Sequence, residues 1–370
     1  MLKLSEADLL QTLDKDLTTA FPFDQYGLTR EELRMKKKQG SLSEDREQRK
    51  SKYSIADLKK KYELALKAIE ALEADRTKIL DLKGTVETYT IAPRKSGGKS
   101  EATAVWVASD WHTDELIDPG TVNGLNSFNP TIAQKRVNNF FTSGLRLTNI
   151  LAQDVEIKTI VLALLGDFFT GHIHPDFMEL TDTEPIHAVI RAQNMIASGI
   201  QYILDNSTYD LVIPCHSGNH ARTTEKTRFA TENGHSLEFY MYHFLADHFK
   251  DKPRVKFLLS TGYMSYMDIY GYRIRFMHGH ALKYGGGIGG IFIPAFKAIS
   301  QWDKSQRADL TVFGHFHQSK DGGNFICNGS LIGYSAFALS IKADYEKPKQ
   351  TLFLVDKDRG RTCVWPILVG

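Results

Sequence analysis

Apolar residues in the second part of the chain alternate between short β-branched runs and longer stretches with helical spacing. The short runs predict buried strands, and the longer stretches predict amphipathic helices. Their alternation up to about residue 250 predicts a layered α/β core. After residue 255 the runs are short and helical patterns are sparse, so we expect a second sheet with fewer helices. The predicted strands cover residues 104–109, 159–165, 210–215, 254–259, 266–278, 310–317, 323–330 and 351–356, and the predicted helices cover residues 131–151, 186–204 and 235–250.

The first part of the chain has a different composition. Proline, glycine and charged residues cluster near residue 93, which predicts a boundary between a helical N-terminal region, residues 1–92, and a domain over residues 100–370. Apolar positions at helical spacing over residues 53–82 predict an amphipathic helix. Two interpretations stay open, a coiled coil that joins chains into a homo-oligomer and a helix packed on its own domain. The charge-dense residues 28–52 are typical of a solvated helical face, with contact to a phosphate backbone as the alternative.

The composition is typical of a soluble globular protein. Of the 370 residues, 42% are hydrophobic and 24% are charged, and a formal net charge of +2 gives no argument for a strongly basic nucleic-acid binder. Cys215, Cys327 and Cys363 are too dispersed to predict a disulfide framework or a thiolate zinc site. The first residues lack the apolar run of a signal peptide or a membrane span. We therefore expect a soluble cytoplasmic protein without a membrane partner.

Four clusters of polar residues share one position in this pattern, because each lies just after a hydrophobic β-type run. Strand ends are where open α/β sheets build their sites. In D-x-H and H-x-H on an extended segment, side chains two positions apart point to the same side and can present two ligands together. Carboxylate, amide and imidazole donors without thiolates suit divalent manganese, iron, nickel or zinc, with manganese as the first choice. The clusters are Asp110-Trp111-His112, Gly166-Asp167, Gly218-Asn219-His220 and Gly314-His315-Phe316-His317.

The order of these clusters resembles that of a known family. The series D-x-H, G-D, G-N-H, H-G and G-H-x-H is similar to the motifs of calcineurin-like metallophosphoesterases, and the resemblance covers roughly residues 100–360. It implies a layered α/β/β/α sandwich with two divalent ions that stabilise the attacking and leaving oxygens at phosphorus. In the phrase FMHGHAL the match falls on His278, with His280 as a neighbouring group. The resemblance implies that Asp110, His112 and His317 hold one ion, that Asn219, His278 and His315 hold the other, and that Asp167 bridges them.

The histidine that follows Asn219 has a separate role in this resemblance. His220 matches the family's catalytic histidine, which contacts the phosphoryl group and acts as a general acid for the leaving oxygen. The acids that usually orient this histidine are replaced by Thr170 and Ala221. Either another group holds His220, or its acid role is weakened and the metals do most of the work. The candidates for the orienting group are His172, Asp176 and His235.

Three further features are less specific. Arg222 follows the G-N-H turn, where it can meet a substrate phosphate or face solvent. His172 flanks the second motif, so we expect it to line the cleft and contact substrate. The glycines within residues 285–290 fit G-x-G-x-x-G but lack the strand, helix and acid of a dinucleotide site, and they predict a loop or a plain turn beside the fourth motif.

Wider similarity suggests a substrate. The phrases GDFFTGHIHPD, GNHARTT and CNGSLIGYSAFALS look like phosphoesterases encoded by bacteriophages, and the chain is similar to SbcD-type nucleases. We therefore expect a two-metal DNA phosphodiesterase, in the host cytoplasm if a phage encodes it. A small-molecule nucleotide phosphodiesterase or phosphatase is the alternative enzyme, because this family acts on many phosphoesters. A non-catalytic assembly protein that recruits partners through its N-terminal helix is the alternative outside enzymes.

Overall fold

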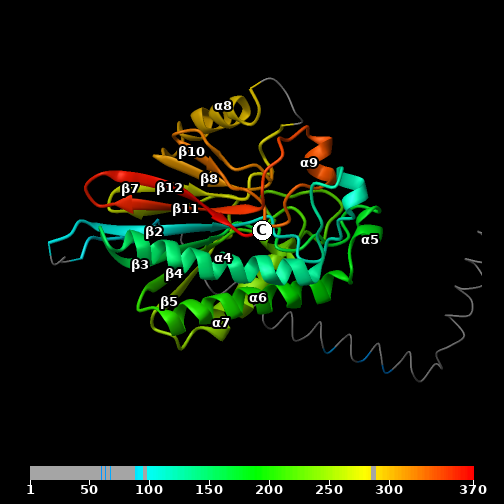
Figure 1. Cartoon of the computed structure of the whole chain (residues 1–370), viewed down its shortest axis with the longest axis horizontal. Helices are drawn as coiled ribbons and strands as arrows, with labels where there is room; N and C mark the ends of the chain where they lie inside the picture. Colours follow the sequence, from blue (N-terminus) through cyan, green and yellow to red (C-terminus); the bar gives the residue numbers. More distant parts are fainter. Residues whose placement is uncertain (1–59, 61–62, 64–66, 68–87, 95–97, 285–288) are drawn as a thin grey trace, which may run out of the picture. The chain divides into compact units, whose positions relative to one another are not determined.

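In the computed structural model, the described residues from Thr88 onward build two six-stranded sheets with helices beside them (Figure 1). The predicted α/β class is therefore confirmed. The predicted helix over residues 53–82, and the homo-oligomer it would form, lie outside the described residues except at three positions. In the part of the chain that the structure describes, no helix has the length and apolar character needed to cross a membrane. The described residues are 88–94, 98–284 and 289–370, with Lys60, Glu63 and Lys67 as isolated positions.

Sheet I has the strand order β12-β11-β2-β3-β4-β5. Strands β2 to β5 are parallel neighbours in chain order, whereas β11 and β12 add to the β2 edge in antiparallel pairing. Parallel neighbours need crossover connections, and helices lie in all three of them. The strands are β2 (Glu101–Ala108), β3 (Glu156–Leu164), β4 (Asp210–Cys215), β5 (Val255–Leu259), β11 (Lys349–Asp356) and β12 (Gly360–Leu368).

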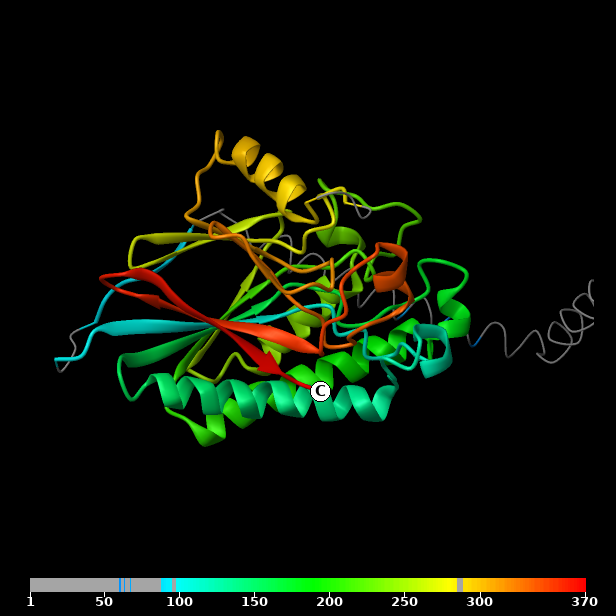
Figure 2. The same ribbon diagram turned by 45° about the horizontal axis from the view of Figure 1, so that its top comes forward.

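The crossover helices α4 (Pro130–Leu151), α6 (Pro185–Asn206) and α7 (Leu237–His248) lie close to the predicted ranges. Local sequence sets where they begin. The side chains of Asn129 and Ser236 accept hydrogen bonds from backbone N–H groups in the first turns of α4 and α7, and a proline stands in the first turn of α4 and of α6. The three helices cover one face of sheet I and share its core, and Figure 2 shows α4 along this face.

The central strands of sheet I, β2, β3 and β4, are largely apolar because both faces of the sheet are covered there. In β2, Trp106 packs toward the helices, whereas Val105 and Val107 pack toward sheet II. In β3, Leu162 packs toward the helices and Val161 packs toward sheet II. This alternation, with every second side chain on one face, produces the near-continuous hydrophobic runs that predicted buried strands.

Sheet II has the order β1-β6-β7-β8-β10-β9 and mixes parallel with antiparallel pairs. The predicted strand over residues 266–278 is a hairpin, β6 and β7, because Tyr270 and Gly271 both have positive φ and form a tight turn. Helix α8 (Phe292–Trp302) packs on the outer face of this sheet, opposite the α4 side of the unit (Figure 2). The strands are β1 (Tyr89–Ile91), β6 (Ser265–Ile269), β7 (Tyr272–Phe276), β8 (Leu310–Phe313), β9 (Lys320–Asp321) and β10 (Phe325–Cys327).

Three expectations about organisation need correction. β1 lies before the boundary predicted near residue 93, yet it pairs with β6, so sheet II begins before that boundary. β5 and β11 belong to sheet I, although they begin at or after residue 255, because the apolar pattern reflects burial and does not identify strand partners. Helix α8 and strand β12 lie in segments where neither was predicted. The remaining short helices are η3 (Pro119–Val122), α5 (Phe177–Leu180), η4 (Asn233–His235) and α9 (Ala336–Ser340).

Candidate metal centre

The predicted ligands meet in one buried cluster, because their loops leave the carboxyl ends of neighbouring strands. Strands β2, β3 and β4 of sheet I and β7 and β8 of sheet II each end just before one or two of them. Within the described residues, three groups of acidic and imidazole side chains have ligand atoms within 4.8 Å of one another, so they can hold a metal ion. The groups are Asp110, His112 and His317, then His112, Asp167 and His220, and lastly Asp167, His278 and His315.

Asn219 joins this cluster through His278. Its Oδ1 lies 3.1 Å from Nε2 of His278, and Oδ2 of Asp167 lies 2.9 Å from the same nitrogen. The ring of His280 is 5.6 Å away from that of His278, and its Nε2 lies 3.4 Å from Glu232. The structure thus brings all seven predicted ligands together and places His280 beside them.

Backbone strain is concentrated in the cluster. A residue with a Cβ rarely adopts a φ in the left-handed region, since the Cβ then crowds the backbone. Only eight non-glycine residues do so in the described part of the chain, and the cluster holds five of them. Such strain persists where the surrounding structure imposes it and is typical of functional sites. The five are Asp110 at 56°, His112 at 49°, Asp167 at 56°, His315 at 70° and His317 at 54°.

The ligand loops approach one another so closely that glycine is required. A Cβ on Gly166 would overlap the backbone of Gly218, and a Cβ on Gly218 would overlap Asp167. A Cβ on Gly314 would overlap the carboxylate of Asp110. The glycines of the G-D, G-N-H and G-H-x-H motifs therefore permit the contacts that assemble the cluster.

Three histidines direct Nε2 into the cluster because their Nδ1 atoms bond elsewhere. The Nδ1–H of His278 donates to the carbonyl of Leu165 at 2.7 Å, and that of His220 donates to the carbonyl of Thr170 at 2.9 Å. A carbonyl can only accept, so Nδ1 carries a proton in both rings. The Thr170 hydroxyl donates to a carboxylate and accepts from Nδ1 of His112 at 2.9 Å. Among the described residues, the buried Nε2 of His112 has no hydrogen-bond partner, as expected of a metal ligand.

The carboxylate of Asp110 is held by a network of donors. Its two oxygens lie 2.9 and 3.0 Å from the backbone N–H of His315, and Oδ2 accepts from the Ser109 hydroxyl at 2.5 Å. That hydroxyl in turn accepts from Nδ2 of Asn328 at 2.9 Å. Burial raises the pKa of Asp110 to about 7, and the negative charge of Asp167 acts in the same direction. This carboxylate therefore gains from a nearby cation.

Asp167 and His278 form a buried ion pair at the centre of the cluster. Burial alone would raise the pKa of Asp167, but His278, through its charge and its hydrogen bond, holds it well below its ordinary value. Burial alone would lower the pKa of His278, but Asp167 raises it to about 10. Burial lowers the pKa values of His112 and His315 well below the usual range. The cluster thus favours positive charge beside Asp167 and keeps its other imidazoles in the neutral form that binds metals.

The group that orients His220 was not among the sequence candidates. The carbonyl of Thr170 accepts from its Nδ1, and the carboxylate of Asp114 fixes that carbonyl by accepting from the N–H groups of Thr170 at 2.6 Å and Gly171 at 3.2 Å. Asp114 is fully buried. A backbone carbonyl, and not a side-chain acid, therefore accepts from Nδ1 of His220. The candidates that the structure does not place in this role are His172, Asp176 and His235.

The two substrate-binding candidates are already engaged in hydrogen bonds. The guanidinium of Arg222 donates to the backbone carbonyls of Asn219 at 2.7 Å, Thr224 at 3.1 Å and Glu225 at 3.3 Å, so it braces its own loop. Nε2 of His172 lies 3.0 Å from a threonine hydroxyl. Contact of either residue with a substrate stays a prediction.

Glu238 is a functional candidate that the motifs did not single out. It lies in the first turn of α7, where the helix N-terminus favours negative charge, and it is fully buried. Its two oxygens accept from the N–H groups of Phe168 and Gly218, each at 2.7 Å. Because these N–H groups are next to Asp167 and Asn219, Glu238 fixes the spacing of two ligand loops. Burial and the charge of Asp167 raise its pKa to about 8.

We expect Glu238→Gln to loosen this bracing. An amide can accept only one of the two N–H bonds, and its own NH₂ would face the other N–H. An unmade buried hydrogen bond of this kind lowers the free energy of unfolding by about 1–3 kcal/mol. Loss of a residue that supports the metal ligands by hydrogen bonds weakens metal binding about 10–100-fold. Urea unfolding of the metal-free protein and manganese titration measure both effects. Glu179→Gln, at an exposed position, is the control, and equal behaviour of the two variants would contradict the bracing role.

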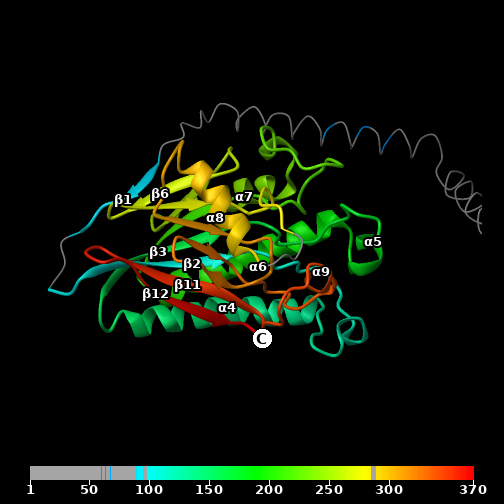
Figure 3. The same ribbon diagram turned by 90° about the horizontal axis from the view of Figure 1, so that it is seen from above.

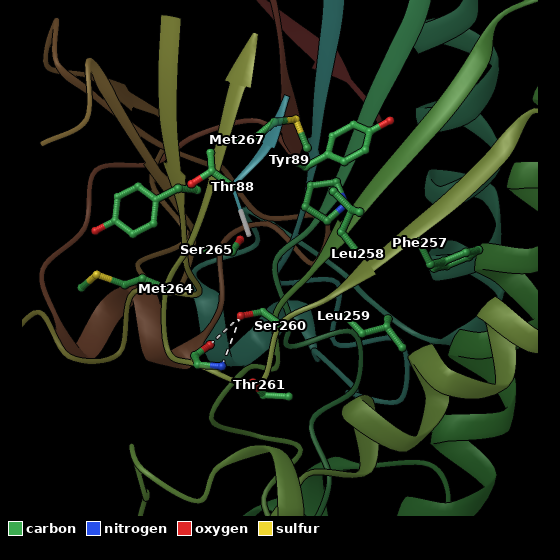
Figure 4. Close-up of a pocket in the computed structure, with 13 residues that line it drawn as sticks. Thr88, Tyr89, Phe257, Leu258, Leu259, Ser260, Thr261, Met264, Ser265 and Met267 are labelled. Atoms are coloured by element: carbon green, nitrogen blue, oxygen red, sulfur yellow. Dashed lines mark hydrogen bonds between the residues drawn. The ribbon is translucent and has the colours of Figure 1, made fainter. Parts of the chain in front are cut away.

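A separate cavity of about 310 Å³ lies beside β5 and β6 (Figure 4). Phe257 and Leu258 line it from β5, and Met267 and Ser265 line it from β6. The Ser260 hydroxyl bonds to the backbone of the next turn at its rim. None of the predicted site residues lines this cavity, so it is distinct from the cluster.

Comparison with known proteins gives a distant structural similarity. No protein-family model and no curated protein matches the chain. Among solved structures, it is similar to the hypothetical protein PH1004 from Pyrococcus horikoshii OT3, with 12% sequence identity and a TM-score of 0.33 over 72% of this chain and 89% of that chain. A TM-score this low supports no conclusion about function. The function is therefore inferred from the chemistry of the cluster itself.

Proposed function

We propose that this chain is a two-metal phosphoesterase of the calcineurin-like class that hydrolyses phosphodiester bonds in DNA. The observation that carries the proposal is the meeting of seven predicted ligands from five loops, five of them at positive φ. Strain maintained at so many ligands argues for a required geometry and against an incidental cluster. The helix, sheet, sheet, helix layering supports the sandwich fold of the same class.

The donor set fits divalent metal ions. The three groups contain carboxylates and imidazoles but no cysteine, and the unpartnered Nε2 of His112 is available as a ligand. The proposal includes two ions, with manganese as the first choice and iron, nickel or zinc as alternatives. One ion would be held by Asp110, His112 and His317, the other by Asn219, His278 and His315, and Asp167 would bridge them.

The chemistry divides between the ions and the residues. When bound, the ions supply a nucleophile from water and neutralise charge on the attacking and leaving oxygens. Hydrolysis forms a P–O bond from water and breaks the P–O bond to the leaving oxygen, which takes up a proton. His220 is the proposed donor of that proton from Nε2, since Thr170 occupies its Nδ1. Burial lowers the pKa of His220, and Asp167 acts in the opposite direction by favouring its protonated form.

The first test is metal content together with cleavage. We expect elemental analysis to find two divalent ions per chain, and we expect manganese-dependent cleavage of single- or double-stranded DNA. DNA as substrate rests on the resemblance to SbcD-type nucleases and phage phosphoesterases. Hydrolysis of a chromogenic phosphodiester without any DNA cleavage would favour the small-molecule enzyme instead. Protein that holds no metal and cleaves neither substrate would overturn the proposal in favour of the assembly protein.

A further inference from the structure

Aromatic side chains surround the cluster. The ring of Phe177, in α5, lies 5.2 Å from that of His220, and the ring of Phe337, in α9, lies 5.1 Å from that of His317. Phe229 lies on a third side, 5.5 Å from His280. Figure 3 shows α5 and α9 at the same end of the unit. These rings come from loops and short helices beside the ligand loops, and the apolar cores do not include them.

Phe337 is exposed at the edge of the cluster. It is 37% exposed, although its ring is 5.1 Å from that of His317 and 6.3 Å from that of His315. Exposure alone does not set this ring apart, since Phe244 on α7 is 51% exposed, but Phe337 combines exposure with a position beside two predicted metal ligands. Because the ring of Phe337 lies beside His315 and His317, it can contact a group that is bonded to a phosphoryl group bound at the cluster.

Phe229 has a similar environment on the loop after the G-N-H motif. One face of its ring lies on His280 with an interplanar angle of 22°, and the edge contact with Tyr263 is at 5.2 Å. The Tyr263 hydroxyl is fixed because it accepts from the N–H of Ala281 at 2.8 Å. Phe229 is nevertheless 49% exposed. The ring of Phe229 therefore packs on neighbouring rings and is still exposed to solvent, so another flat ring can stack on it.

We infer that Phe229 and Phe337 stack on nucleobases beside the scissile phosphodiester, so that the substrate is single-stranded nucleic acid. Aromatic side chains next to a phosphate site bind unpaired bases because every base has a π-face. In a duplex the bases stack on one another, and reaching a protein ring would first require unstacking them. This inference rests on the proposed phosphodiesterase activity and adds which form of the substrate the site takes.

The test compares cleavage of two single strands of equal length, one with bases and one without. Full-length wild-type protein, Phe229→Leu, Phe337→Leu and the double variant are assayed with manganese on a thymidine oligonucleotide and on the same length of abasic tetrahydrofuran nucleotides. We expect each leucine to lower kcat/KM on the thymidine strand roughly tenfold, mainly through KM, and to leave the abasic strand unchanged. Phe244→Leu, at a residue 51% exposed on α7, is the matched control.

The outcomes separate this inference from the proposed function. Equal losses on both strands would mean that the rings only support the fold, and wild-type protein that treats both strands alike would exclude base stacking. Absence of hydrolysis on every phosphodiester would count against the proposed function. In that case calorimetric affinities for the two strands, measured without turnover, still decide whether the rings bind bases.

Discussion

Asp167→Asn is expected to abolish metal binding at both positions and to remove nearly all turnover. Asp167 belongs to two of the three ligand groups, and its carboxylate contacts His278 while accepting from the backbone N–H of His220 at 2.9 Å. An asparagine keeps the volume and the acceptor for that N–H, so the fold should persist. It removes the negative charge and one oxygen ligand. The loss of metal affinity should exceed the roughly 10–100-fold loss that follows removal of a residue that only hydrogen-bonds to a ligand.

Two measurements make this result specific. Elemental analysis gives the metal content, and thermal unfolding with and without manganese gives binding without any need for activity. A metal at 100 times its Kd stabilises the folded state by about 2.7 kcal/mol, so wild-type protein should melt higher with manganese and the variant should not. Asp247→Asn, at an exposed carboxylate paired with Lys250, is the control. Unchanged metal content and turnover in Asp167→Asn would refute the assignment of Asp167 as the bridging ligand.

The fold could be predicted where both faces of an element are covered. Strands β2, β3 and β4 have long apolar runs because helices and sheet II bury them, and α4, α6 and α7 show the spacing of helices with one buried face. β1 has three residues, too few for a pattern to emerge. β12 is a half-exposed edge strand whose burial does not alternate, and it contains Pro366. Local patterns also cannot say which sheet a strand joins.

The site could be predicted where its residues are defined by local spacing. D-x-H, G-D, G-N-H and G-H-x-H each place a ligand directly after a strand, and strand ends converge in three dimensions. The supporting contacts that hold the ligand loops in place were not predicted. The backbone carbonyl of Thr170 and the carboxylate of Glu238 act through tertiary contacts, and a carbonyl leaves no trace in a sequence. A glutamate in the buried first turn of α7 was the one available signal for Glu238.

The backbone carbonyl that orients His220 bears directly on what this histidine does. It fixes the ring and leaves Nε2 toward the cluster, which suits both proton donation and contact with a phosphate oxygen. The ring lies 4.7 Å from that of His112. Because a carbonyl carries no full charge, it supports the imidazolium less than the usual carboxylate would. The two roles therefore need a test that depends on the leaving group.

We expect His220→Asn to cost about 10²–10⁴ in rate on DNA, the range typical of general acid catalysis. On a nitrophenyl phosphodiester the loss should be much smaller, since nitrophenolate departs readily as an anion and needs little protonation. Metal content should not change, because Asn219 and not His220 is the predicted ligand, and rates are compared at matched manganese occupancy. Equal losses on both substrates would exclude proton donation as the main role of His220 and assign it to holding the phosphate, a role that the neutral imidazole fixed by Thr170 can also perform.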